Sequence, residues 1–457
     1  MNKKLMALAV AGALTAPGLA FAQVGGSSGV TLYGRLDETI MNTKYGSAFS
    51  NTGVAINEVK KGDIFSPGNA IGVRGREDLG GGTAVWFQLE AGAWPDGRLD
   101  AAATTGSHFG GRNSGLGVSS ELGDIMFGIW DTPYKVAYGT GNLVTSGGFA
   151  SSGIIMGNGD TTGALANPVC TNTVSNAAGS VTTAGNGVCV TEATSNATAW
   201  SRRVNNSVQY WSPVFNGFQV KVMTALANYQ SPASVPAYTN GVPKPKEYSG
   251  NVTWARGPLA LAVGFDSHQG LLRAVTPPGG VTDPKDTAVQ IGGKWDFGMA
   301  QVGLGYEKVK YGNAAGTGQP SNQMDLTAYV INGRVSAGPG QVWGSYSRTP
   351  GGKSCIQPAA FNPNNGTNNL TIGSAACGDA GKAKMTTLGY DYIMSKRTKM
   401  YVAYNKIDNG ISTNYYYIAG PAANGPGPAA ANGTGTNGGL AAGSDVKTFA
   451  IGIQHTF

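Results

Sequence analysis

Charged residues at alternate positions are the first groups in the sequence whose types and spacing could do chemistry. Arg35 and Asp37 stand two residues apart, and so do Arg74 and Arg76. Residues two apart in an extended chain point to the same side, so each pair shares a face that excludes its apolar neighbours. A guanidinium group keeps its charge at any physiological pH, and a face lined with such groups attracts anions. Strands are therefore the elements needed to present these charges.

Three short strings resemble catalytic or phosphate-binding motifs. Residues 25–29 fit the serine-hydrolase string, and residues 433–438 fit the dinucleotide string. Neither lies between a strand and a helix, as that chemistry requires. Residues 352–354 resemble the end of a phosphate loop, but Ser347 stands where the first glycine is required. We expect no enzymatic activity and no cofactor.

Period-two alternation recurs along the chain and predicts strands with one apolar and one polar face. In 259–266, Leu, Leu, Val and Phe alternate with Ala, Ala, Gly and Asp, and 218–223, 289–296 and 301–307 show the same pattern. Past the N-terminal 22 residues, no apolar stretch approaches the ~20 residues that a membrane-spanning helix needs. We therefore expect an all-β chain.

Short and long connections alternate between the expected strands. The tight links are rich in Gly, Pro or Asp and lie at 79–82, 121–124, 213–217, 256–258, 296–299, 337–340 and 394–398. The long Gly/Ser/Thr/Asn-rich stretches lie near 46–68, 94–107, 132–203, 229–247, 269–285, 311–323, 350–383 and 408–445. Such long stretches are uncommon in a compact soluble domain.

A transmembrane antiparallel β-barrel follows from these two patterns. About sixteen strands, with short periplasmic turns and long external loops, are typical of an outer-membrane barrel. A sheet in a bilayer must close, because an unpaired edge would leave backbone groups unsatisfied in hydrocarbon. The polar strand faces of so large a barrel line a water-filled channel. Aromatic residues near strand ends fit the interfacial girdles of such barrels; they are Tyr33, Trp130, Tyr210, Phe215, Trp254, Phe297 and Tyr392.

The N-terminus has the pattern of a cleaved export signal. Two lysines precede an apolar run at 5–19, and an Ala-Phe-Ala triplet at 20–22 supplies the small residues that a signal peptidase reads. The alternative is an uncleaved anchor, but Pro17 and its neighbours shorten the apolar run. We expect removal of 1–22 and a single domain at 23–457.

Composition argues against nucleic-acid binding. Charged residues are 12% of the chain, about half the roughly 25% that soluble domains carry. The net charge of +7 is spread along the length and forms no basic stripe of the kind that nucleic acid needs.

The four cysteines fall in two of the long stretches. Cys170 and Cys189 lie in one, and Cys355 and Cys377 in the other. Four cysteines allow three pairings, an oxidising periplasm favours disulfides, and locality favours one bridge within each stretch. A zinc site is the alternative, but the spacings match no ligand pattern. No histidine is near either pair; the three are His108, His268 and His455. We expect no metal.

The chain ends on an alternating segment, 449–457, whose last residue, Phe457, is an aromatic on the apolar face. Four further motifs occur in order: VTLYG at 30–34, GREDLGGG at 75–82, FQLE at 87–90 and RVNNSVQY at 203–210. Together they resemble the general trimeric porins of Gram-negative bacteria, especially the β-proteobacterial branch, over essentially the whole chain past the leader.

The resemblance implies a homotrimer of sixteen-stranded barrels for passive diffusion of small hydrophilic solutes and ions, with the third loop, 132–203, folded into the lumen as a constriction. It implies an outer-membrane location among lipopolysaccharide and lipid, and a barrel assembly machinery that reads Phe457. By the same resemblance, a basic eyelet wall matches Arg35, Arg74, Arg112 and Arg203, with Asp37, Arg76 and Glu90 as further lumen charges. The alternative is that these arginines are ordinary solvated or interface charges.

The third loop departs from the family pattern. Between 134 and 198 its only carboxylates are Asp160 and Glu192, so we expect unopposed arginines and a channel that prefers small anions. Two other functions stay open. A substrate-specific porin would use the long third loop as a binding site. A secreted β-rich adhesin would share the leader but show a fixed repeat period and no terminal strand ending in Phe457.

Overall fold

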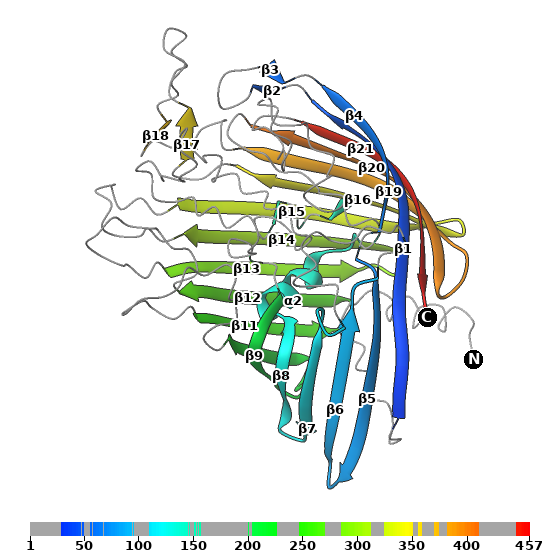
Figure 1. Cartoon of the computed structure of the whole chain (residues 1–457), viewed down its shortest axis with the longest axis vertical. Coiled ribbons are helices and arrows are strands. Elements are labelled where there is room, and N and C mark those ends of the chain that lie inside the picture. The colour runs from blue at the N-terminus through cyan, green and yellow to red at the C-terminus, as the bar shows by residue number, and fades with distance from the viewer. Residues whose placement is uncertain are drawn as a thin grey trace.

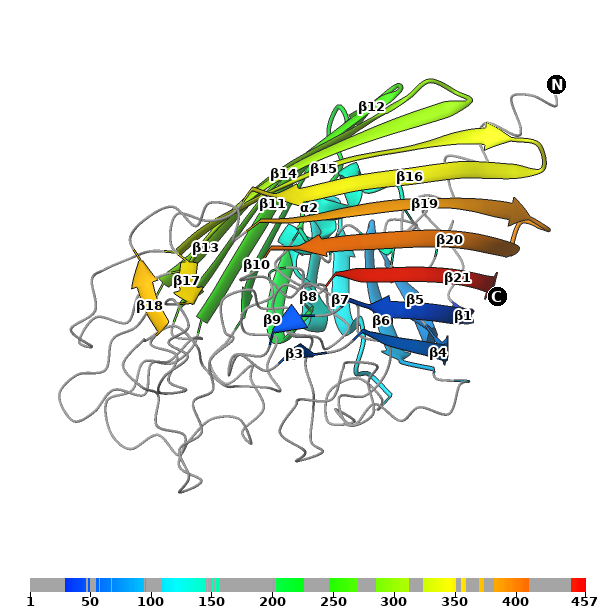
Figure 2. The same ribbon diagram turned by 90° about the horizontal axis from the view of Figure 1, so that it is seen from above.

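The computed structural model shows an antiparallel sheet that curves around an inner helix, α2 (Pro133–Gly141) (Figure 1; Figure 2). It describes residues 29–46, 48–49, 55–56, 58–66, 68–93, 95, 109–144, 146, 150–151, 153, 155–156, 200, 203–225, 246–269, 285–311, 324–350, 355–358, 370–373, 382–410 and 445–457. Within these residues, no helix has both the length and the apolar character to cross a membrane.

The main sheet and two small hairpins contain all the strands of the described residues. The main sheet comprises β1 (Gly29–Tyr45), β4 (Val59–Phe65), β5 (Ala70–Gly80), β6 (Thr83–Ala91), β7 (Ser114–Ser120), β8 (Gly123–Asp131), β9 (Arg203–Trp211), β10 (Phe218–Ala225), β11 (Lys246–Arg256), β12 (Leu259–Gln269), β13 (Lys285–Asp296), β14 (Ala300–Tyr311), β15 (Met324–Ala337), β16 (Gly340–Thr349), β19 (Ala383–Ile393), β20 (Thr398–Asn409) and β21 (Val446–Thr456). The hairpins are β2 (Ala48–Phe49) with β3 (Ala55–Ile56), and β17 (Cys355–Pro358) with β18 (Leu370–Gly373).

The main sheet closes into a barrel because its first and last strands pair. β1 and β21 lie side by side in Figure 2 and are antiparallel partners from Arg35 opposite Thr456 to Tyr45 opposite Val446. The other edge of β1 pairs with β5 and then β4, so these two segments are successive parts of one barrel strand. Counted in this way, the described wall has the sixteen strands expected from the sequence.

Phe457 completes the seam between the two ends of the chain. Its backbone N–H donates to the carbonyl of Gly34, and the Gly34 N–H donates back, both at 3.1 Å. The Phe457 ring covers Gly34, where an added Cβ would lie 2.3 Å from the ring. A glycine is therefore needed for the terminal aromatic to pack at this point.

Alternation decides which side chains face the lumen. In β12, Leu261, Val263 and Phe265 are exposed, whereas Ala262 and Asp266 are buried. The buried set faces inward, because α2 lies against it inside the barrel. The polar faces predicted from the sequence are therefore the inner faces, and the apolar faces are the outer ones.

The seven tight links predicted from the sequence are all hairpin turns between consecutive barrel strands. The long stretches are less uniform than predicted. Residues 46–68 contain β4, which pairs with Thr39–Tyr45 of β1. Two lysines and an aspartate in β4 hide its alternation, and only the long partner strand makes it part of the wall. Residues 350–383 contain the β17–β18 hairpin, and 132–203 begins with α2.

Two of the aromatic residues expected in outer girdles point inward instead. The Tyr33 hydroxyl donates to Glu90 across the inner face, because position 33 has the same parity as the inward Asp37. Trp130 packs against Trp86 and Trp211. Its inward direction follows the ordinary alternation of β8, in which Met126 is buried and Ile125 and Phe127 are exposed.

Candidate functional site

The four arginines singled out in the sequence lie on one side of the barrel interior, and we call them the basic wall. Arg35 is on β1, Arg74 on β5 and Arg203 at the start of β9, and Arg112 lies two residues before β7. The charge of Arg112 acts on both Arg35 and Arg203. The fold therefore gathers side chains that are far apart in sequence, because β1 and β5–β9 are neighbours in the sheet.

Arg112 is not unopposed, contrary to the expectation drawn from the third loop. Its Nε donates to Glu90 Oε1 at 2.6 Å, and its backbone N–H donates to the Glu90 carbonyl at 3.0 Å. The Tyr33 hydroxyl donates to the other Glu90 oxygen at 3.0 Å, and the Arg74 guanidinium lies 5.1 Å from the Tyr33 ring centroid. The opposing carboxylate comes from the barrel wall and not from the third loop, and it belongs to Glu90, one of the further lumen charges expected from the sequence.

Arg203 is opposed in the same way by Asp131, which precedes the third loop. Its Nη2 lies 3.2 Å from Asp131 Oδ1, and its Nε donates to Asn113 Oδ1 at 2.6 Å. Asn113 Nδ2 in turn donates to Asp131 Oδ2 at 2.9 Å. Lys135 of α2 lies 3.0 Å from the same carboxylate. Asp131 therefore orients Arg203 and ties the start of α2 to the basic wall.

The remaining predicted lumen charges are also on the inner face. Arg35 donates to the carbonyl of Gly68 at 2.8 Å. Asp37 is buried and accepts hydrogen bonds from Tyr401 and Gln454 at 2.7 and 2.9 Å. Arg76 donates to Ser119 at 3.2 Å, nearer the β5–β6 turn. The charged side chains thus occupy different heights along the barrel.

Three tryptophans form a packed layer beside the charged layer on the same wall. Trp86, Trp130 and Trp211 have ring centroids 5.5 to 5.8 Å apart. Trp86 lies over Gly117, where an added Cβ would be 2.4 Å from the ring. Gly72, Gly115 and Gly117 on these strands likewise make room for inward side chains of the same chain.

The residues described within 132–156, which we call the constriction segment, cross the interior along the opposite wall. α2 begins here because the Thr132 side chain accepts from the Lys135 N–H and Pro133 occupies the first turn. The helix lies on inward glycines of β13 and β14: an added Cβ at Gly303 would be 2.3 Å from the Gly141 carbonyl oxygen. Glycine at this position lets the helix and strand backbones touch.

Amide and hydroxyl side chains of the wall hold the constriction segment in sequence order. Ser249 and Asn251 of β11 bond the Tyr134 N–H and the Pro133 carbonyl at 3.0 and 2.6 Å. Asn332 of β15 donates to the carbonyl of Gly141 at 2.8 Å and accepts from the N–H of Leu143 at 2.9 Å. Further along, Ser146 donates to both oxygens of Asp391 at 2.8 Å.

The far end of the constriction segment packs into two apolar clusters on the inner face. Val144 and Ala150 join a cluster formed with Met41, Phe65, Trp343, Tyr401, Ala403 and Ala450. Ile155 and Met156 join a second formed with Tyr45, Ala328, Val330, Ala383, Met385, Ile407 and Val446. The segment therefore spans the interior from β11 to the strands at the seam.

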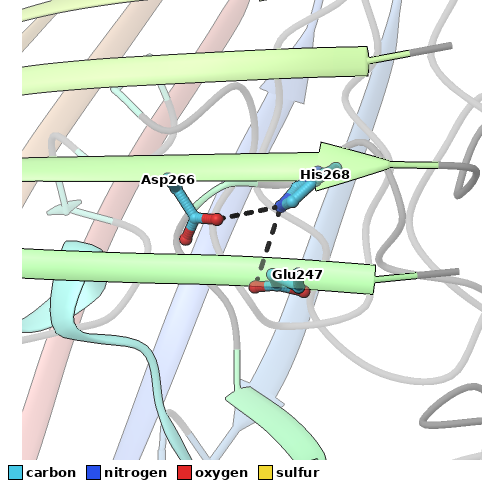
Figure 3. Close-up of side chains that lie close together, drawn as sticks. All are labelled: Glu247, Asp266 and His268. Atoms are coloured by element: carbon cyan, nitrogen blue, oxygen red, sulfur yellow. Dashed lines mark ion pairs between the residues drawn. The ribbon is translucent and has the colours of Figure 1, made fainter. Parts of the chain in front are cut away.

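A buried group of Glu247, Asp266 and His268 lies on the inner faces of β11 and β12 (Figure 3). The imidazole Nε2 is 3.7 Å from Glu247 and 3.6 Å from Asp266, and its ring stacks on Trp200 with centroids 4.0 Å apart. The three donor atoms are close enough together to hold a metal ion, but each residue also has a further interaction partner. We interpret the group as the contact that holds Trp200, ahead of β9, against the wall.

Several residues named from the sequence lie outside the described residues. These are Cys170, Cys189, Cys377, His108, Asp160, Glu192 and residues 1–22. Cys355 begins β17 and stands opposite Gly373 of β18. Four further residues lie in the lumen but were not predicted from the sequence: Tyr33, Asn113, Asp131 and Lys135. The parity of β1 could have revealed Tyr33.

Comparison with known proteins identifies the family. A family profile described as Gram-negative porin matches residues 7–412. The chain belongs to the Gram-negative porins. It is 26% identical over 404 residues to outer membrane porin protein 32 of Delftia acidovorans, with 88% of each chain covered.

Two solved structures share the porin fold. An anion-selective porin from Comamonas acidovorans has a TM-score of 0.60 at 19% identity, with 94% of this chain and all of that chain covered. OmpT of Vibrio cholerae has a TM-score of 0.52 at 15% identity, with the same coverage. This porin is therefore an outer-membrane channel, as expected from its sequence, and it belongs to a family of channels rather than enzymes. The adhesin alternative is withdrawn.

Proposed function

We propose that this porin conducts small anions in preference to cations. The observation that carries the proposal is the basic wall facing the constriction segment. The charged side chains on this side of the passage are Arg35, Arg74, Arg76, Arg112 and Arg203 against Asp37, Glu90 and Asp131, and Lys135 of α2 lies beside Asp131. The excess is positive even though two arginines have carboxylate partners. A fixed positive charge in a narrow aqueous passage raises the local anion concentration.

Arg74 is the arginine whose charge is least offset within the basic wall. Among the described residues its recorded contact is the Tyr33 ring, whereas Arg112 and Arg203 each have a carboxylate within 3.2 Å. The name of the Comamonas porin supports the same selectivity, and that protein shares the fold.

The reversal potential across a KCl gradient in a planar bilayer tests the proposal. We expect an anion-selective sign for the wild type and a clear shift towards cations for Arg74→Gln. Arg256→Gln, at the exposed turn between β11 and β12, is the matched control and should leave the potential unchanged. A cation-selective wild type would overturn the proposal. The difference in reversal potential between the wild type and Arg74→Gln should become small near 1 M salt, where the Debye length is about 3 Å.

We also propose that the chain assembles as a homotrimer. Val30, Leu32 and Ile40 on the outer face of β1 are 60% to 71% exposed, which leaves an apolar strip for a neighbouring subunit. The OmpT structure named above is described as a trimer form. Light scattering in mild detergent should give a trimer mass for the wild type and a smaller species for Leu32→Arg/Ile40→Arg. A monomer mass for the wild type would contradict the assembly.

The remaining expectations concern export and the external loops. We propose that 1–22 is removed, that the assembly machinery reads Phe457, that lipopolysaccharide surrounds the barrel, and that Cys170–Cys189 and Cys355–Cys377 are disulfides. The opposition of Cys355 and Gly373 supports the second pairing, since Cys377 follows four residues later. Thiol labelling of denatured, unreduced protein should find no reactive cysteine. Four reactive thiols would exclude both bridges.

A further inference from the structure

Three hydrogen-bond donors converge on Asp391 at the far wall of the barrel. Ser146 of the constriction segment donates to both carboxylate oxygens at 2.8 Å. Trp343 Nε1 of β16 donates at 2.8 Å, and Lys399 Nζ of β20 donates at 3.0 Å. Lys399 also donates to the Ser146 hydroxyl at 2.6 Å. The serine therefore bonds to both members of a lysine–carboxylate pair.

The pair is poorly exposed, so its two charges depend on each other. The Asp391 side chain is 1% exposed and that of Lys399 is 14% exposed. A charge-assisted hydrogen bond is stronger than a neutral one, and a buried charge that loses its partner is strongly unfavourable. Ser146 thus lies at a contact stronger than the neutral amide contacts that hold Gly141 and Leu143.

This contact lies at the height of the basic wall. Lys399 stands opposite Gln454 in the β20–β21 register, and Gln454 stands opposite Asp37 in the β1–β21 register. Asp37 is two residues from Arg35 on the same inner face. A displacement of Ser146 therefore changes the space between the constriction segment and the cations of the basic wall.

We propose that Asp391 and Lys399 are positioning residues that hold Ser146 and so keep the open passage at one cross-section. The proposal rests on the channel function above. The pair acts through the constriction segment and does not itself decide the sign of ion selectivity. Releasing Ser146 lets the segment move between positions, and the conductance of an open channel then fluctuates.

Single-channel recording tests this proposal with four variants. Asp391→Asn and Lys399→Met each remove one charge, and Ser146→Ala removes the hydroxyl while leaving the pair intact. In each we expect about a tenfold rise in the frequency of sub-conductance steps, the change that corresponds to losing one charge-assisted hydrogen bond. The control is Asp408→Asn, on β20 like Lys399. It removes a carboxylate that pairs with Lys384 and Lys406, and its frequency of sub-conductance steps should equal that of the wild type.

A double variant separates positioning from loss of fold. Asp391→Asn/Lys399→Met removes both charges, so no buried charge is left without its partner and we expect the barrel to assemble normally. The frequency of sub-conductance steps should still be higher than in the wild type. The proposal would be overturned if folded Ser146→Ala and the double variant both showed the same frequency of sub-conductance steps as the wild type. The sign of the reversal potential should stay that of the wild type in every variant. A wild-type protein that forms no anion-selective channel would instead contradict the proposed function.

Discussion

The two sides of the barrel interior use the same alternating strands for different purposes. On β5–β9 the inward side chains are long, charged or aromatic, and they pack against one another, as in the Glu90–Arg112 pair and around Trp86. On β11–β15 small and neutral side chains such as Ser249, Gly303 and Asn332 receive the constriction segment, and the inward charges there, such as Glu247, are buried. One wall therefore supplies the charge of the passage, and the other positions the segment that narrows it.

The difference shows that inward polarity alone does not identify a pore-lining residue. An inward asparagine that bonds the backbone of the constriction segment is buried, as Asn332 is, and meets no solute. The lining is the part of the inner face that the segment leaves uncovered. The two walls should accordingly respond differently to mutation.

The largest loss of unfolding free energy is expected in the layer of three tryptophans beside the basic wall. Trp86→Ala removes a buried ring from contact with Trp130 and Trp211, and emptying such a site costs about 3–5 kcal/mol. Urea unfolding of the refolded protein measures the loss. Trp295→Ala, on the outer face, is the control and should cost much less. Equal losses for the two variants would mean that the inner layer gives no special support.

The next largest effect on stability is expected where α2 packs against the barrel wall. Gly303→Ala brings a methyl group against the Gly141 carbonyl oxygen, and overpacking of this kind costs about 1–3 kcal/mol. We expect reduced stability and an altered single-channel conductance, because the helix must move. Gly250→Ala adds the same atom at ordinary contact distance, with its nearest neighbour at 3.6 Å. A wild-type conductance in Gly303→Ala would show that α2 does not set the passage.

Removing a carboxylate beside the basic wall should increase the preference of the channel for anions. Glu90→Gln keeps an acceptor for Arg112 but removes the opposing charge, so the ratio of chloride to potassium permeability should rise about twofold in dilute salt. Reversal potentials measure the ratio. Glu121→Gln, at the β7–β8 turn, should leave it unchanged. A fall in the ratio for Glu90→Gln would mean that the arginine loses its orientation when the charge is removed.

The smallest effect is expected at the Tyr33 hydroxyl. Tyr33→Phe removes one hydrogen bond to Glu90 but keeps the ring beneath Arg74. We expect a loss of about 1 kcal/mol in unfolding free energy and an unchanged sign of selectivity. Tyr346→Phe, on the exposed outer face, provides the comparison. A reversed selectivity in Tyr33→Phe would assign the hydroxyl a larger part in orienting the charges.

Much of the fold could be predicted because it depends on local pattern. Alternation with period two identifies strands, and its phase decides which residues face outward, as Leu32 and Phe265 do. Gly, Pro and Asp at the tight links determine where strands reverse. The inward placement of Arg35 and Arg74 follows from the same phase. None of these inferences requires knowing which strands are neighbours.

Other features depended on neighbours that the sequence does not name. β4 belongs to the wall only because β1 is long enough to pair with it after β5. The partner of Arg112 lies on β6 and that of Arg203 at the end of β8, so a count of acids in the third loop could not find them.

The sequence by itself determined the class of the protein: a closed barrel in the outer membrane with arginines on its inner face, because periodicity, turn residues and family motifs are local properties. Only the tertiary structure decided which of those charges are opposed and how the constriction segment is held. Glu247 and His268 meet across two paired strands, and Ser146 of the constriction segment meets Asp391 of β19. Such contacts depend on sheet register and on the path of a segment through the barrel, and both are fixed only when the strands close.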